Sequence, residues 1–98
     1  MRKITRNACK ITRNACSAFE AGYDFFESNT RVENNKMYLW GNLIAYKENG
    51  DTYITLAGWN TRTTRERLNG LHGVSITTKQ GTPYLNGEPI TSRGVYKV

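Results

Sequence analysis

The chain of 98 residues is long enough for one domain with a modest core and too short for two. Apolar residues make up 38% of it and charged residues 22%, with 9 Gly and 2 Pro, which is typical of a globular protein. No apolar run approaches the roughly 18 residues of a membrane-spanning helix, and the basic N-terminal stretch lacks the apolar segment of a secretory signal. The sequence therefore predicts a cytoplasmic protein that is not attached to a membrane.

The formal net charge of +6 is unevenly distributed along the chain. Residues 1–16 carry five basic side chains and no acidic one, residues 17–60 sum to −3, and residues 61–98 sum to +4. Basic ends around an acidic middle suit a polyanion or an acidic protein as the partner.

The N-terminal segment predicts a basic amphipathic helix over residues 1–22. The heptapeptide Lys-Ile-Thr-Arg-Asn-Ala-Cys at 3–9 recurs unchanged at 10–16, and an insertion of nearly two helical turns keeps the helix faces in register. Gly22 is the expected end of the helix. The predicted apolar stripe consists of Ile4, Ala8, Ile11, Ala15, Ala18 and Phe19.

Residues Lys36 to Ala57 predict an antiparallel β-hairpin. Two stretches rich in aromatic and β-branched residues flank Asn49-Gly50, the dipeptide best suited to a type I′ turn. The expected cross-strand pairs are Leu43 with Leu56, Ala45 with Ile54, and Tyr46 with Tyr53. One face of the hairpin then carries Leu39, Leu43, Ala45, Ile54 and Leu56, and the other carries Tyr38, Trp40, Ile44, Tyr46 and Tyr53.

The aromatic face of this hairpin has two alternative roles. Exposed rings on a sheet can stack unpaired bases. The alternative is that the N-terminal helix covers this face, in which case the rings are core residues, and large aromatic side chains in small cores favour that alternative.

A short helix is predicted after the loop Gly58-Trp59-Asn60. The segment Thr63 to Glu66 has the Thr-x-x-Glu spacing of a capping box, and the helix should stop at Asn69-Gly70 or Gly73. Its inward residues would be Leu68 and Leu71, and its outward residues Arg62, Arg65 and Arg67.

Further short strands are predicted in the same sheet. Val74 to Lys79 predicts a strand, Gln80-Gly81 a turn, Tyr84 to Gly87 a hairpin corner, and Val95 to Val98 a last strand. Pro83 and Pro89 are suited to a sheet edge. The whole chain, residues 1–98, is therefore expected to be a single α+β domain.

Three segments resemble a group of small, uncharacterised proteins of tailed bacteriophages. They are Met-Tyr-Leu-Trp-Gly-Asn-Leu-Ile-Ala at 37–45, Ala-Gly-Trp-Asn-Thr-Arg-Thr-Thr-Arg-Glu-Arg-Leu-Asn at 57–69, and Tyr-Leu-Asn-Gly at 84–87. The resemblance implies a phage origin, and it carries over no activity.

Nothing in the sequence has the spacing of a catalytic, metal or cofactor site, so we expect no enzyme activity, no metal and no cofactor. His72 is the only histidine and has no activating partner nearby in sequence. Cys9 and Cys16 lie about 10 Å apart on one helix, too far for a disulfide, and are expected to be free thiols.

The expected function is therefore binding, by a monomer or weak dimer, and the partner is nucleic acid or a host protein. Nucleic acid would be held by basic side chains on phosphates and by tryptophans on bases. The alternative is an inhibitor or adaptor that binds a host protein, since Trp, Tyr and Arg also anchor protein interfaces. The candidate contact residues are Arg62, Arg65, Arg67, Trp59, Trp40, Arg6, Lys10 and Arg13.

Overall fold

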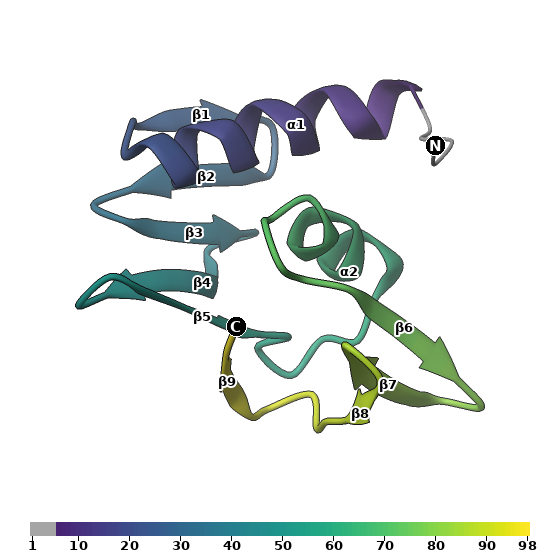
Figure 1. The fold of residues 1–98 in the computed structure, drawn as a ribbon. Coiled ribbons are helices and arrows are strands. Elements are labelled where there is room, and N and C mark those ends of the chain that lie inside the picture. The colour runs from purple at the N-terminus through teal and green to yellow at the C-terminus, as the bar shows by residue number, and fades with distance from the viewer. Residues whose placement is uncertain (1–5) are drawn as a thin grey trace.

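The computed structural model describes residues 6–98, with side chains from Lys10 onward, as an α+β fold of two helices and nine strands (Figure 1). The elements are α1 (Arg6–Ala21), β1 (Phe25–Glu27), β2 (Thr30–Glu33), β3 (Lys36–Leu39), β4 (Asn42–Glu48), β5 (Asp51–Thr55), α2 (Arg62–Asn69), β6 (Ile76–Lys79), β7 (Thr82–Leu85), β8 (Glu88–Pro89) and β9 (Val95–Lys97). The strands form two antiparallel sheets, of order β1-β2-β3-β4-β5-β9 and β6-β7-β8. The α+β class is confirmed, but the expectation of one sheet is wrong.

Two-residue turns set the topology of both sheets. Both central residues have a positive φ, as a type I′ turn requires, at Asn34-Asn35, Trp40-Gly41, Asn49-Gly50, Gln80-Gly81 and Asn86-Gly87. Such turns match the twist of the flanking strands, so the two strands that each turn joins pair with one another. In the six-stranded sheet, β9 is the strand that returns from a distant part of the sequence, and it pairs with β5.

The predicted hairpin turn at Asn49-Gly50 is confirmed. Two predicted cross-strand pairs are also confirmed, Ala45 with Ile54 and Tyr46 with Tyr53. The third predicted pair, Leu43 with Leu56, is not formed, because β5 ends at Thr55.

A β-bulge between β3 and β4 reverses two predicted side-chain directions. Met37 pairs with Ala45 and Tyr38 pairs with Leu43, which leaves Ile44 as the extra residue. Ile44 is therefore buried instead of sharing the aromatic face, and Leu43 lies half-buried on the side of Tyr38.

Helix α1 packs on one face of the six-stranded sheet, the inner face (Figure 1). Its buried residues are Thr12, Ala15, Cys16, Ala18 and Phe19, and the inner face contributes Val32, Met37, Leu39, Ala45 and Ile54. Gly22 ends the helix at a φ of 84°, as predicted, and its amide donates to the Ala18 carbonyl at 2.8 Å. Within the predicted stripe, Ile11 is half-buried, while Ile4 and the side chain of Ala8 lie outside the described part.

Helix α2 begins earlier than predicted. Its N-cap is Thr61, whose hydroxyl accepts a hydrogen bond from the Thr64 amide at 3.2 Å. The predicted capping box that starts at Thr63 is therefore wrong, because the Thr61 side chain already accepts a hydrogen bond from an amide of the first turn. The helix ends at Asn69, with Gly70 as its C-cap, as predicted.

Gly70 also lets α2 approach α1 closely. A methyl group at Gly70 would lie 2.6 Å from Thr12 Cγ2 and 2.7 Å from Cys16 Sγ. Carbon contacts are most favourable at about 3.5–4.0 Å, so no side chain fits there without separating the helices.

The three-stranded sheet repeats the arrangement of β2, β3 and β4. Residues 38–44 and 84–90 share the pattern Tyr-Leu-x-Gly-x-x-Ile, and β3 and β7 have the same order of exposed and buried residues. A helix precedes the strands in both halves of the chain. Each half therefore places one tyrosine, Tyr38 or Tyr84, at the same position of a three-stranded meander.

Pro89 lies on the edge strand β8, as predicted, but Pro83 lies on the central strand β7. The Pro83 carbonyl accepts a hydrogen bond from the Ile90 amide at 3.0 Å, just beyond the end of β8. In an antiparallel strand the N and the C=O of one residue point to the same side, so the missing N–H of Pro83 faces the chain just beyond the end of β8. Strand β8 therefore loses no hydrogen bond to β7.

Strands β1 and β2 were not predicted. The acidic residues Glu27 and Glu33 are the last residues of β1 and β2. Strand β1 has only three residues, and in β2 the two buried residues are Thr30 and Val32, so a polar residue interrupts the apolar alternation.

Candidate nucleic-acid interface

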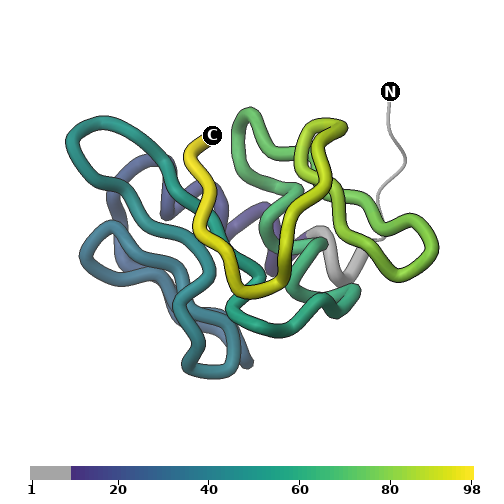
Figure 2. Tube along the Cα trace, turned by 90° about the horizontal axis from the view of Figure 1, so that it is seen from below, coloured from purple at the N-terminus to yellow at the C-terminus, as the bar shows by residue number. Residues whose placement is uncertain are grey.

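The loop between β5 and α2 carries Trp59, whose side chain is 57% exposed. A distant part of the chain lies against this loop, as the view from below shows (Figure 2). The Gly58 amide donates to the Ser92 carbonyl at 2.7 Å, and a side chain at Gly58 would lie 3.5 Å from the guanidinium of Arg93. Arg93 therefore lies beside the residue that precedes Trp59.

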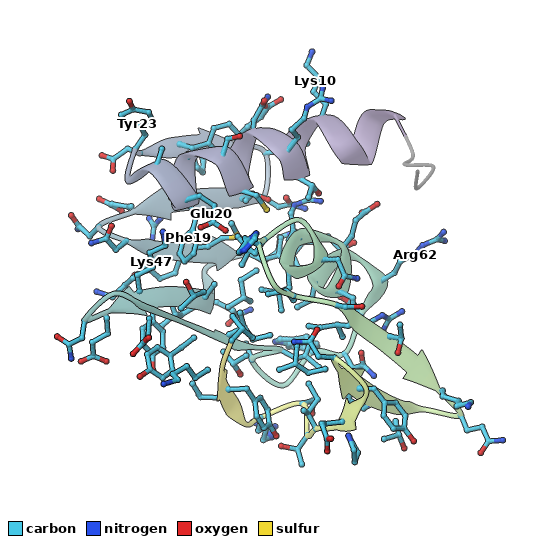
Figure 3. All side chains as sticks on the ribbon, viewed as in Figure 1. Lys10, Phe19, Glu20, Tyr23, Lys47 and Arg62 are labelled. Carbon is cyan, nitrogen blue, oxygen red and sulfur yellow. The ribbon has the colours of Figure 1, made fainter. Side chains whose placement is uncertain are left out.

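Two more arginines adjoin the loop. Arg65 donates from Nη1 to the Asn60 side-chain oxygen at 2.7 Å and to the Asn60 carbonyl at 3.2 Å. Arg62 is exposed at the start of α2 and projects outward (Figure 3). We call Trp59, Arg62, Arg65 and Arg93 the Trp59 surface.

Tyr96 fixes the turn that carries Arg93. Its hydroxyl oxygen accepts a hydrogen bond from the Thr91 amide at 2.9 Å, and the Thr91 hydroxyl accepts one from the Gly94 amide at 3.1 Å. Hydrogen bonding by the Thr91 side chain, and then by its backbone, lowers the pKa of Tyr96. Sequence reasoning missed Arg93, because only the tertiary fold brings it to Gly58.

The expectation that Arg67 points outward is wrong, since the residue is only 4% exposed. Its guanidinium donates to the Thr30 hydroxyl at 2.9 Å, to the Thr12 hydroxyl at 2.8 Å and to the Asn29 side-chain oxygen at 3.4 Å. Burial lowers the pKa of Arg67, and the Glu66 carboxylate, 3.7 Å away, opposes that effect. Arg67 therefore ties α2 to α1 and β2, and it is not available to a ligand.

The basic residues of α1 form a separate region. Lys10 and Arg13 are exposed, and Lys10 and Arg62 project from different helices without pointing toward one another (Figure 3). The side chain of Arg6 lies outside the described part of the structure.

The outer face of the six-stranded sheet carries the predicted aromatic residues. Tyr38 alternates with the buried Met37 and Leu39, so it lies on the face opposite α1. Tyr46 and Tyr53 lie on the same outer face, with ring centroids 5.1 Å apart and ring planes 15° from parallel. We call Tyr38, Tyr46 and Tyr53 the tyrosine face. The expectation that the helix covers these rings is wrong, because α1 packs on the inner face.

Trp40 does not belong to the tyrosine face. It has a φ of 51° and occupies the turn between β3 and β4, where its side chain is 59% exposed. The prediction took residues 36–48 as one strand, because Trp is typical of strands and only the following Gly41 indicates a turn. Trp40 therefore remains an exposed candidate for contact with a ligand, but it lies in the β3–β4 turn and not on the tyrosine face.

Among the histidines and cysteines, the structure describes the side chains of His72 and Cys16. His72 is exposed, and its amide donates to the Glu20 carboxylate at 2.9 Å. Burial, with a smaller contribution from Glu20, raises the pKa of Cys16 to about 12, so this free thiol is neutral near pH 7. Within residues 6–98, no three His, Cys, Asp or Glu side chains gather as a metal site, and no helix is long and apolar enough to cross a membrane.

The fold and its exposed surfaces define a small α+β protein with two helices packed on antiparallel sheets. The chain belongs to the family described as Kyanoviridae Gp96 protein, whose family model matches residues 1–97. This match confirms that it is a tailed-phage protein. No curated protein and no solved structure matches the chain.

Proposed function

We propose that this phage protein is a non-catalytic binding protein that contacts nucleic acid through the Trp59 surface. The observation that carries the proposal is the convergence of Arg65 and Arg93, from separate parts of the chain, on the loop that exposes Trp59. Guanidinium groups suit phosphate oxygens, and an indole ring can stack on a base.

The Trp59 surface is also partly organised before any ligand binds. Asn60 accepts two hydrogen bonds from Arg65, and the turn fixed by Tyr96 holds Arg93 against Gly58. Side chains that are already ordered lose less conformational entropy on binding. The charge of +4 over residues 61–98 favours a polyanionic ligand. We expect the protein to act in the host cytoplasm as a monomer or weak dimer.

The test compares two double variants with equal changes of charge. Arg62→Gln with Arg93→Gln removes two charges from the Trp59 surface and leaves Arg65 to hold Asn60. Lys10→Gln with Arg13→Gln removes two charges from α1. Binding of a fluorescent 20-nucleotide single strand would be measured by anisotropy at several salt concentrations, with a thermal melt of each variant.

The first double variant should bind more weakly and lower the salt slope of log affinity by about 1.4, because each phosphate contact to a single strand contributes about 0.7. The α1 variant should keep the wild-type slope. Equal weakening by both variants would contradict a localised Trp59 surface. Wild-type protein that binds neither single strands nor duplexes at low salt would overturn the proposal and favour a host-protein partner.

A further inference from the structure

The tyrosine face lies on the side of the six-stranded sheet opposite the core, where its three rings are half-buried. Its three rings lie on neighbouring strands β3, β4 and β5, which are spaced about 4.8 Å apart. The inner sides of the same strands supply the buried residues Met37, Ala45 and Ile54. The hydrophobic core therefore lies on the other side of the sheet from these rings.

Phe26 extends this aromatic surface toward the sheet edge. It pairs with Arg31, which in turn pairs with Tyr38, so all three lie on the outer face. Phe26 is 73% exposed. The Arg31 guanidinium lies 4.5 Å from the centre of the Tyr38 ring and covers one face of it. A base can stack on that face only when the Arg31 side chain turns away to a phosphate group.

Basic side chains flank the rings on both sides. Arg31 lies on β2 and Lys97 on β9, where Lys97 pairs with Tyr53. Their ion pairs, Arg31 with Glu33 at 3.6 Å and Lys97 with Asp51 at 3.9 Å, are exposed. Exposed pairs of this kind contribute about 0–1 kcal/mol, so Arg31 and Lys97 can each turn from the carboxylate to a phosphate group at little cost.

The tyrosine face is also continuous with the Trp59 surface along the chain. Strand β9, which carries Lys97, follows directly from the turn that holds Arg93 beside Gly58 (Figure 2). Strand β9 therefore links the segment that carries Arg93 to the strand that carries Tyr53.

We propose that the tyrosine face stacks unpaired bases, so that the ligand class of this protein is single-stranded nucleic acid. This inference rests on the proposed function. Tyr38, Tyr46 and Tyr53 contact the bases, while Arg31 and Lys97 contact phosphates. Unpaired bases fit because stacking on an aromatic ring requires an open base face, which a duplex does not offer.

The experiment compares Tyr38→Leu with Tyr84→Leu. Tyr84 is the matched control, because it has the corresponding position and similar burial in the three-stranded sheet, outside the tyrosine face. Anisotropy titrations would use fluorescent 12-nucleotide oligo-dT, 12-nucleotide oligo-U and a 12-base-pair duplex. A thermal melt of each variant would accompany them.

Tyr38→Leu should weaken single-strand binding about 5- to 150-fold, which corresponds to the loss of about 1–3 kcal/mol of stacking on one base. Its duplex binding should not change, and Tyr38→Phe, which keeps the ring, should bind more tightly than Tyr38→Leu. Tyr84→Leu should bind the single strand like the wild type.

Ring carbon and proton NMR shifts of Tyr38, Tyr46 and Tyr53 in the wild-type protein give a second readout that no substitution can disturb. These shifts should move when oligo-dT is added, and unmoved signals would overturn the inference. The inference would also be overturned if the protein bound the duplex more tightly than the single strands, or if Tyr38→Leu and wild type bound the single strand equally. If the double variant Arg62→Gln with Arg93→Gln still binds more weakly in those cases, the proposed role of the Trp59 surface is retained and only that of the tyrosine face is rejected. No binding by wild type to any of the three probes overturns both proposals.

Discussion

At the scale of single residues, Arg67 combines a charge with almost complete burial. Arg62, Arg65 and Arg67 occur within one short helix, and their sequence spacing does not reveal which of them meets α1. The direction of Arg67 depends on the approach of α1 at Gly70 and on the hydroxyl groups of Thr12 and Thr30. These are tertiary contacts between residues far apart in the sequence, so they could not be predicted from the spacing of the arginines.

Arg67→Ala should lower the free energy of unfolding by about 3 kcal/mol. The change leaves a cavity and removes the donor to the buried Thr12 and Thr30 hydroxyls. Urea denaturation would measure the loss, with Arg62→Ala as the exposed control, expected within about 0.5 kcal/mol of wild type. Equal stability of the two variants would contradict a structural role for Arg67.

Cys16 should couple stability to alkaline pH. Its thiol donates to the Arg67 carbonyl at 3.2 Å, and burial raises its pKa to about 12, above the value of about 8.5 in an unfolded chain. The stabilising contribution of the protonated thiol is therefore complete below about pH 8.5 and is lost as the pH rises toward 12.

The measurement is the urea midpoint at pH 8 and at pH 10.5, for wild type and for Cys16→Ala. Any stability advantage of wild type over the variant should shrink at the higher pH. A gap that stays constant would show that the Cys16 thiol titrates normally in the folded protein.

At the scale of elements, sequence reasoning succeeded where one residue type meets one backbone requirement. The turn Asn49-Gly50 and the helix end at Gly22 are examples, because both need a positive φ. It failed at β1, which has only three residues, and at β2, where one of the two buried residues is the polar Thr30. It also failed at Ile44, where a bulge changes the alternation. Trp40 was misplaced because a bulky residue at positive φ is uncommon.

Deleting residues 3–9 should leave the fold and the thermal midpoint nearly unchanged. The buried side chains of α1 described in the structure lie between Thr12 and Phe19, beyond the deleted segment. The second heptad copy also keeps the helix faces within about 20° of their phase. Thermal melting by circular dichroism is the measurement, and a midpoint lower by more than about 4 °C would show that the first copy packs too.

At the scale of the whole molecule, the sequence predicted the kinds of side chain used for binding better than their positions. Trp59, Arg62 and Arg65 were candidates and adjoin one loop, whereas Arg93 joins them only through the contact of two distant segments. Whether a helix covers the tyrosine face also depends on which side of the sheet α1 packs. The hairpin pattern fixes which residues share a face, but it does not fix which face meets the helix.

The pairing of β5 with β9 has a consequence for the order of folding. Strands β1 to β5 can add one after another, because short turns make each loop closure inexpensive in entropy. Strand β9 must instead wait for the closure of the long segment between Thr55 and Val95. Until then β5 is an open edge with unpaired amides, the kind of edge that captures strands from other chains. We therefore expect the nascent sheet to be most prone to aggregation in the interval before β9 docks.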